Sequence, residues 1–224
     1  MRIYFFCLSL LLWCISCTAQ EVCHIDKLNE DGITLNKCWK FQQGDNVQWA
    51  STNLDDSKWK LIDPVKDIHA LPELKPGVIG WFRLSFTLDK FEQSELGMIM
   101  QSSGASEFYI DGKLINRFGE ISTNPAKIKA YDPLLKPVSL HVSDQSNHVL
   151  AVRYVLQPGV IYSTMYETKN PAILIRLVTL KNAIKYLWFF YKFHCGFTFM
   201  HYWYLLIIGY PAFRFLYFLS CTKG

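Results

Sequence analysis

The sequence predicts an all-β sandwich that is followed, toward the C-terminal end, by a membrane-spanning helix. Short runs of alternating apolar and polar residues recur between residues 24 and 178, with prolines and glycines between them and no convincing helical period. The segment from Phe193 to Phe213 carries no charged side chain. A helix of about 21 residues is long enough to cross the ~30 Å hydrocarbon layer of a bilayer.

The distribution of charge argues against a nucleic-acid-binding protein, although the 224 residues carry a formal net charge of +4. Residues 20–167 hold 15 basic and 19 acidic side chains, whereas residues 168–224 hold seven basic side chains and no acidic one. An acidic body and a basic, aromatic, apolar tail are typical of a protein at a membrane boundary. We therefore expect the membrane, and no nucleic acid, as a partner.

The first residues have the pattern of an export signal. Met1-Arg2 and the apolar run after them are too short to span a bilayer comfortably, and small residues precede Gln20. Cleavage after Ala19, lipidation of Cys17 and an uncut anchor are the alternatives, and each exports the body. The predicted organisation is a signal peptide over 1–19, an exported domain over 20–180, a basic-aromatic juxtamembrane segment over 181–192 and a transmembrane segment over 193–224.

Strands follow one another regularly in the exported domain. Residues 81–88 alternate strictly, which is typical of a half-buried strand. A second strand is expected over 97–101. The sequence Asp111-Gly112 suits a type I′ turn, because both central residues of that turn need positive φ. It therefore predicts a hairpin, and the further strands are expected over 138–142, 148–155 and 172–177.

Two cysteines, Cys23 and Cys38, lie in the exported domain. In an oxidising compartment they could form a disulfide, which would close a short loop and contribute about 3 kcal/mol. Two reduced thiols are the alternative. No spacing of cysteine and histidine indicates a metal site, so we expect neither a metal nor a cofactor. His141 and His148 flank a loop and are expected at the surface.

Four motifs occur in order between residues 39 and 155, and together they resemble the galactose-binding-like domain of family 2 glycoside hydrolases. They are Trp39-Lys40-Phe41 with Asp55-Asp56-Ser57-Lys58-Trp59, Trp81-Phe82-Arg83, Tyr109-Ile110-Asp111-Gly112-Lys113-Leu114-Ile115, and Asn147-His148-Val149-Leu150-Ala151-Val152-Arg153. This resemblance implies a jelly-roll β-sandwich that acts as a carbohydrate-binding accessory domain. In those enzymes the catalytic acids lie in a separate barrel, so the resemblance implies no enzymatic activity here.

A closer resemblance is to the exported sensor region of bacterial receptors with seven-helix "diverse intracellular signalling" modules, which are commonly fused to histidine kinases. The residues that carry it are Gly80-Trp81-Phe82-Arg83, Gly104-Ala105-Ser106-Glu107-Phe108-Tyr109-Ile110-Asp111-Gly112 and Phe118-Gly119. It implies a ligand-sensing domain on the periplasmic side of the bacterial inner membrane, as part of a signal-transduction receptor. An exported structural domain that mediates protein contacts, for example in a homodimer, is the third alternative.

Several aromatic and charged side chains on the predicted strands have the chemistry of a sugar or small-molecule site. Sugars are bound by aromatic faces, which cover their C–H surface, and by charged planar groups, which bind their hydroxyls. The candidate ligand-binding residues are Trp81, Arg83, Glu107, Tyr109, Arg117 and Tyr131. The alternative is that the aromatic members pack in the core and Arg83 pairs with a carboxylate. No catalytic residue is expected, since no nucleophile–base pair or paired carboxylates occur at a usable spacing.

Overall fold

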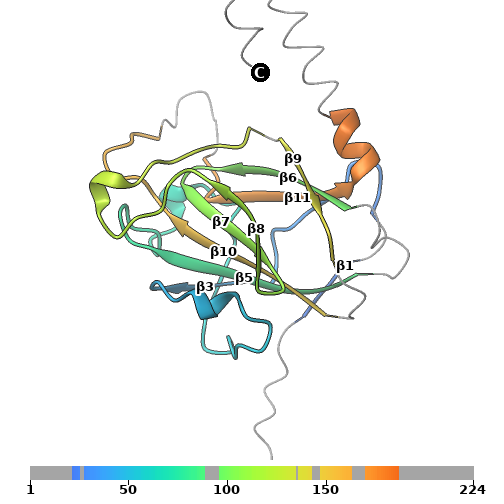
Figure 1. Ribbon diagram of the computed structural model, residues 1–224, viewed down its shortest axis with the longest axis horizontal. Coiled ribbons are helices and arrows are strands. Elements are labelled where there is room, and N and C mark those ends of the chain that lie inside the picture. The colour runs from blue at the N-terminus through green and yellow to red at the C-terminus, as the bar shows by residue number, and fades with distance from the viewer. Residues whose placement is uncertain are drawn as a thin grey trace, which may run out of the picture. The chain divides into compact units, whose positions relative to one another are not determined.

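The computed structural model describes residues 22–25, 28–88, 96–134, 136–142, 147–162 and 170–186. They form two β-sheets in two layers, joined by turns and short 3₁₀ segments (Figure 1), which confirms the predicted all-β sandwich. The predicted signal peptide and transmembrane segment lie outside the described residues. A short helix spans residues 180–186, and within the described part of the chain no helix is long and apolar enough to cross a bilayer.

The larger sheet has seven strands and is antiparallel except at one end of β5. Its main path runs β4, β3, β5, β10, β7, β8. These strands are Lys60–Ile62, Trp39–Gln43, Gly80–Leu88, His148–Val155, Ala105–Ile110 and Lys113–Phe118, in that order. β1 (Cys23–Ile25) pairs in parallel with the last residues of β5, where Cys23 lies opposite Phe86.

The smaller sheet has four antiparallel strands in the order β2, β11, β6, β9. They are Ile33–Thr34, Ile173–Thr179, Leu96–Ser102 and Pro137–Leu140. β11, the last of the described strands in sequence order, therefore lies between β2 and β6. The strands predicted over 97–101, 138–142 and 172–177 correspond to β6, β9 and β11, so these three predictions are confirmed.

The hydrophobic core lies between the two sheets and is built from alternate residues of each strand. On β5, Phe82, Leu84 and Phe86 point into it, as the alternation predicted. The fully buried Trp39 on β3 belongs to the same core, and its indole Nε1 donates to the carbonyl oxygen of Leu35 at 2.9 Å. The smaller sheet contributes the buried side chains of Leu96, Met98, Met100, Ile173, Ile175 and Leu177. The second face of the larger sheet points away from this core.

The predicted hairpin forms between β7 and β8, with Asp111 and Gly112 both at positive φ, 50° and 81°. The Asp111 carboxylate also accepts from the backbone N–H of Val149 at 2.8 Å, and it lies 2.8 Å from Nδ1 of His148. The prediction that His148 is a surface residue is wrong. Its imidazole is fully buried, because Asp111 pairs with one ring nitrogen and the Phe86 ring packs beside it at 5.5 Å.

Candidate functional site

The outer face of the larger sheet carries a buried cluster of three charged side chains. Asp56 accepts from Nε of Arg83 at 3.0 Å and from Nζ of Lys40 at 2.6 Å. Arg83 Nη1 also donates to the backbone carbonyls of Trp49 and Ser51. The Arg83 side chain has no exposed surface, and those of Lys40 and Asp56 expose 10% and 1%. Because solvent cannot reach Arg83, this candidate binding residue pairs with a carboxylate instead of facing a ligand.

Trp81 is also buried, beneath the segment that connects β3 to β4. Its ring packs against Tyr109 at 5.3 Å, and Ala50 covers it together with the half-buried rings of Trp49 and Trp59. These side chains make a second, smaller apolar cluster on the outer face of the larger sheet. Trp81 therefore anchors the covering segment, which is the packing role considered as the alternative.

Glu107, Tyr109 and Arg117 do lie together, but they bind one another. The Glu107 carboxylate accepts from the Tyr109 hydroxyl at 3.0 Å and pairs with Arg117 Nε at 3.2 Å. It also accepts from Arg153, which forms a two-point contact with Asp45 at 2.7 Å. Burial, and then the hydrogen bond to Glu107, raise the pKa of the Tyr109 hydroxyl to about 12. The three candidate residues therefore pair with one another and with Arg153, and the Arg117 side chain stays 65% exposed.

Tyr131 lies apart from the other candidates. Its ring stacks on Phe118 at 6.0 Å with an angle of 5° between the planes, and Phe118 in turn packs against Phe108 in the core. Tyr131 keeps 46% of its surface exposed. The six predicted residues are thus divided among a buried ion cluster, a small apolar cluster, a surface ion network and the stack of Tyr131 on Phe118.

A groove that the sequence did not indicate lies beside β3 and β4. Residues 37–39 and 61–63 form one wall, and Lys66 with residues 70–73 forms the other, around a pocket of about 420 Å³. A second pocket of about 380 Å³ adjoins it and is lined by residues 41–43. The two share Pro72 and Glu73, so we treat them as one groove, the β3–β4 groove. Its total size suits a small-molecule ligand.

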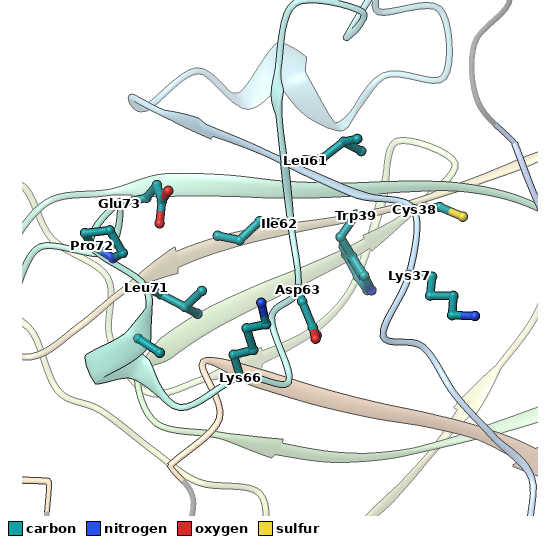
Figure 2. Close-up of a pocket in the computed structure, with 11 residues that line it drawn as sticks. Lys37, Cys38, Trp39, Leu61, Ile62, Asp63, Lys66, Leu71, Pro72 and Glu73 are labelled. Atoms are coloured by element: carbon teal, nitrogen blue, oxygen red, sulfur yellow. The ribbon is translucent and has the colours of Figure 1, made fainter.

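The β3–β4 groove has an apolar floor and a charged rim. Trp39 and Leu71 are buried beneath it, so the apolar surface that a ligand can reach belongs to the exposed Leu61 and Pro72 and the half-buried Ile62. Figure 2 shows Leu71, Pro72 and Glu73 at one end and Lys37 with Cys38 at the other, while Lys66 extends toward the middle. Glu73 forms an ion pair with Lys60. The hydrogen bond that the Lys60 side chain donates is the main reason why the pKa of the Glu73 carboxyl is lowered.

The wall of the groove that is formed by Lys66 and residues 70–73 is attached to the start of β11. The Asp67 carboxylate accepts from the backbone N–H groups of Asn170 and His69, each at 2.9 Å. Ile68 N–H donates to the carbonyl of Asn170 at 3.0 Å, and Ile173 N–H donates to Pro64 at 3.1 Å. We call these contacts the Asp67 clasp. They join the groove wall to the strand that precedes the C-terminal segment.

Replacing Asp67 by alanine is expected to lower the free energy of unfolding by about 1–2 kcal/mol, because hydrogen bonds to an ionised group are lost. The backbone hydrogen bond from Asn170, followed by that from His69, lowers the pKa of Asp67 to about 2. Since the folded pKa lies below the unfolded one, this contribution is complete above about pH 4 and is lost as the pH falls toward 2. Urea unfolding of the unsubstituted protein and of the Asp67→Ala variant, at pH 7 and at pH 3, measures this difference in the free energy of unfolding.

The matched control is Asp55→Ala, since Asp55 Oδ1 accepts from the backbone N–H of Ser57 within its own loop. It should change stability less than Asp67→Ala does at pH 7. Equal stability of the Asp67→Ala variant and the unsubstituted protein at pH 7 would contradict the role given to the clasp.

Cys23 and Cys38 both lie along the same edge of β5. Cys23 is opposite Phe86, and Cys38 directly precedes Trp39, which pairs with Leu84. β10 pairs with β5 on the other side, where His148 lies opposite the same Phe86. Both thiols are half-buried. The pairing register brings the two segments next to each other, and the disulfide stays a prediction.

Comparisons with known proteins give structural likeness only. No protein-family model matches the chain, and no curated protein matches it. Among the described residues, no group of three or more histidine, cysteine or acidic side chains could hold a metal ion. The candidate site therefore rests on the geometry given above.

The solved structures that are similar to the chain include family 2 glycoside hydrolases. This is the family to which the sequence shows the more distant of its two resemblances. A calcium-binding mutant of Bacteroides uniformis β-glucuronidase 2 is 18% identical, with a TM-score of 0.47 over 66% of this chain and 18% of that one. A family 2 member from Bacteroides cellulosilyticus is 16% identical, with a TM-score of 0.44 over 66% of this chain and 21% of that one. Ruminococcus gnavus β-glucuronidase is 10% identical, with a TM-score of 0.43 over 70% of this chain and 31% of that one. The chain spans less than a third of each enzyme.

Proposed function

We propose that residues 20–180 form an exported binding module without catalytic activity, a galactose-binding-like jelly roll. The C-terminal segment would hold it on the periplasmic side of the bacterial inner membrane. The β3–β4 groove is the single observation that carries this proposal, because it is the described concave site that combines a ligand-sized volume, an apolar floor and charged groups. A saccharide or a small polar molecule is the ligand class.

The network around Glu107 supports a module without hydrolase activity. One Glu107 oxygen accepts from Tyr109 and Arg153, and the other pairs with Arg117. Cleavage of a glycosidic bond needs two carboxylates that face a substrate cleft from about 5–9.5 Å apart. Glu107 has three partners within the protein, and we assign it to stabilising the strands.

A sensor role in a receptor is favoured over an accessory carbohydrate-binding role by the Asp67 clasp. A ligand in the groove would contact the wall formed by Lys66 and residues 70–73, and Asp67 and Ile68, which lie between them in the sequence, join this wall to Asn170. A displacement of the wall would reach β11 and the chain that follows it. The accessory role needs no such connection, and a structural interaction domain, for example in a homodimer, needs no groove.

The test is to titrate the full-length chain in mild detergent with a panel of mono- and disaccharides, and to repeat it with Ala70→Trp. Ala70 is exposed and lines the groove, so the added indole would occupy the ligand's space. We expect calorimetric binding of at least one sugar, and its loss in this variant. Ala126→Trp is the matched control, because Ala126 is an exposed alanine in another 3₁₀ turn, Pro125–Lys127. Retained binding in Ala70→Trp would refute the groove as the site.

A further inference from the structure

The charged side chains along the larger pocket of the β3–β4 groove alternate in sign. In Figure 2, Lys37, Asp63 and Lys66 follow one another across the pocket, and the carboxylate lies between the two lysines. Glu73, at the far end of the pocket, is already paired with Lys60. The neighbour of the Lys66 ammonium group in the pocket is therefore a carboxylate and not a second cation.

One β-turn holds this cation and this carboxylate. The backbone N–H of Lys66 donates to the carbonyl oxygen of Asp63 at 3.2 Å, and Pro64 occupies the second position of the turn, where proline is favoured. Asp63 Oδ1 accepts from the backbone N–H of Val65 at 3.1 Å, which fixes the carboxylate. Within the described part of the chain, neither Asp63 nor Lys66 has an ion-pair partner. Asp63 Oδ2 and the Lys66 ammonium group can therefore bind a ligand.

A cation and an anion in one turn favour a ligand that carries both charges. An anionic ligand would be attracted by Lys66 and repelled by Asp63, and a cationic ligand would meet the reverse. In both cases the two interactions largely cancel, because they have opposite signs and similar distances. A ligand with a carboxylate and an ammonium group can place each beside its counter-charge, so both contacts contribute to its affinity.

Apolar surface that a ligand can reach lies in the same pocket. Ile62 is half-buried and lines the pocket, and Figure 2 shows the Lys66 side chain extending toward it. The C–H groups of a sugar ring can cover this surface and remove it from water. The pocket of about 420 Å³ has room for a monosaccharide.

We infer that the ligand of the β3–β4 groove is a zwitterionic saccharide, an amino sugar that also carries a carboxylate group. Lys66 binds the carboxylate of this ligand, Asp63 binds its ammonium group, and its ring lies against Ile62. This inference rests on the proposed function and adds to it the charges of the ligand.

The experiment is calorimetric titration of the full-length chain, in mild detergent at pH 7, with sugars that differ in charge. Glucose is neutral, glucosamine is cationic, glucuronate is anionic and muramate is zwitterionic. Muramate should bind about tenfold more tightly than either singly charged sugar, because it adds one charged contact. Valine is the fifth probe, since it is a zwitterion without a sugar ring.

Two conservative variants test the two contacts separately. Lys66→Gln should weaken muramate binding about tenfold and should not weaken glucosamine binding, because it removes a like charge from that sugar. Asp63→Asn should weaken muramate binding by a similar factor and should not weaken glucuronate binding. The asparagine oxygen can still accept from the N–H of Val65, so the turn is retained.

The matched controls make the same substitutions outside the groove. Asp132 also precedes a proline and accepts from the backbone N–H two residues further on, that of Leu134, at 2.9 Å. Lys127 is an exposed lysine, and neither residue lines the groove. Asp132→Asn and Lys127→Gln should each change the affinity for muramate less than about threefold.

The outcomes separate this inference from the proposed function. Muramate binding that weakens in both Lys66→Gln and Asp63→Asn supports both proposals. If muramate binds no more tightly than glucose or a singly charged sugar, or if either variant keeps its full affinity, the inference is overturned and the binding module stands. Valine binding as tight as that of muramate overturns the role given to the ring. No binding of any of the four sugars overturns both proposals.

Discussion

Replacing Asp56 by alanine is expected to lower the free energy of unfolding by about 3–5 kcal/mol, which is the usual cost of removing one partner from a buried ion pair. Asp56 is the carboxylate that pairs with both Lys40 and Arg83. Without it, two cations would remain on the outer face of the larger sheet, with at most a tenth of either side chain exposed. Urea unfolding of the full-length chain, followed by tryptophan fluorescence, measures the change.

Lys40→Met is the informative comparison. It removes one of the two cations and leaves Arg83 paired with Asp56, so the cluster changes from a net charge of +1 to neutral. We expect a loss well below that of Asp56→Ala, since no unpaired charge remains buried. As a surface reference, Glu120→Ala breaks an ion pair with Lys129 in which both side chains are more than half exposed, and it should cost less than about 1 kcal/mol. Similar losses for Asp56→Ala and Glu120→Ala would disprove the buried-cluster account.

Replacing Gly119 by alanine is expected to cost about 2–4 kcal/mol, the sum of backbone strain and steric overlap. Gly119 has a φ of +77°, and a Cβ atom there would lie 2.1 Å from the carbonyl oxygen of Lys129. That carbonyl accepts from the backbone N–H of Glu120 at 2.9 Å, in an isolated bridge between the two segments. The alanine variant must therefore displace the bridge. Thermal unfolding gives the cost.

Gly159→Ala separates the cost of backbone strain from the cost of steric overlap. Gly159 has the same φ of +77°, but no atom lies within 4 Å of the position that its Cβ would take. This variant should lose only the strain of the left-handed backbone, about 1–2 kcal/mol. If Gly119→Ala cost no more than Gly159→Ala, the close contact with Lys129 would have no energetic weight.

The sequence predicted the longer strands well because their signals are local. The alternation over 81–88 is visible within eight residues, and the Asp111-Gly112 turn needs only its two flanking runs. β1 to β4 were not predicted as strands. β1, β2 and β4 have two or three residues, too few for a periodic pattern, and all four strands pair with β5, β11 or one another.

The candidate site was harder to predict, because burial depends on which segment covers a strand. Trp81 and Arg83 alternate with core residues on β5 and so belonged to the face expected to meet solvent or ligand. The segment carrying Trp49 and Asp56 covers that face. A signal for this existed, since Asp56 belongs to the first of the four motifs, which precedes the β5 strand. The β3–β4 groove had no comparable signal, because turns bring together its lysines from four unconnected positions.

The position of β11 sets the order in which the groove can be completed during synthesis. This strand comes last in the sandwich, yet it lies between β2 and β6, and the Asp67–Asn170 hydrogen bond joins residues 103 positions apart. Contacts of such long range form slowly, because a long loop must close before they contribute any stability. A growing chain that has not reached residue 173 lacks the clasp that positions one wall of the groove. Ligand binding would thus begin only after β11 has been synthesised and has paired, so that only the complete domain would bind its ligand.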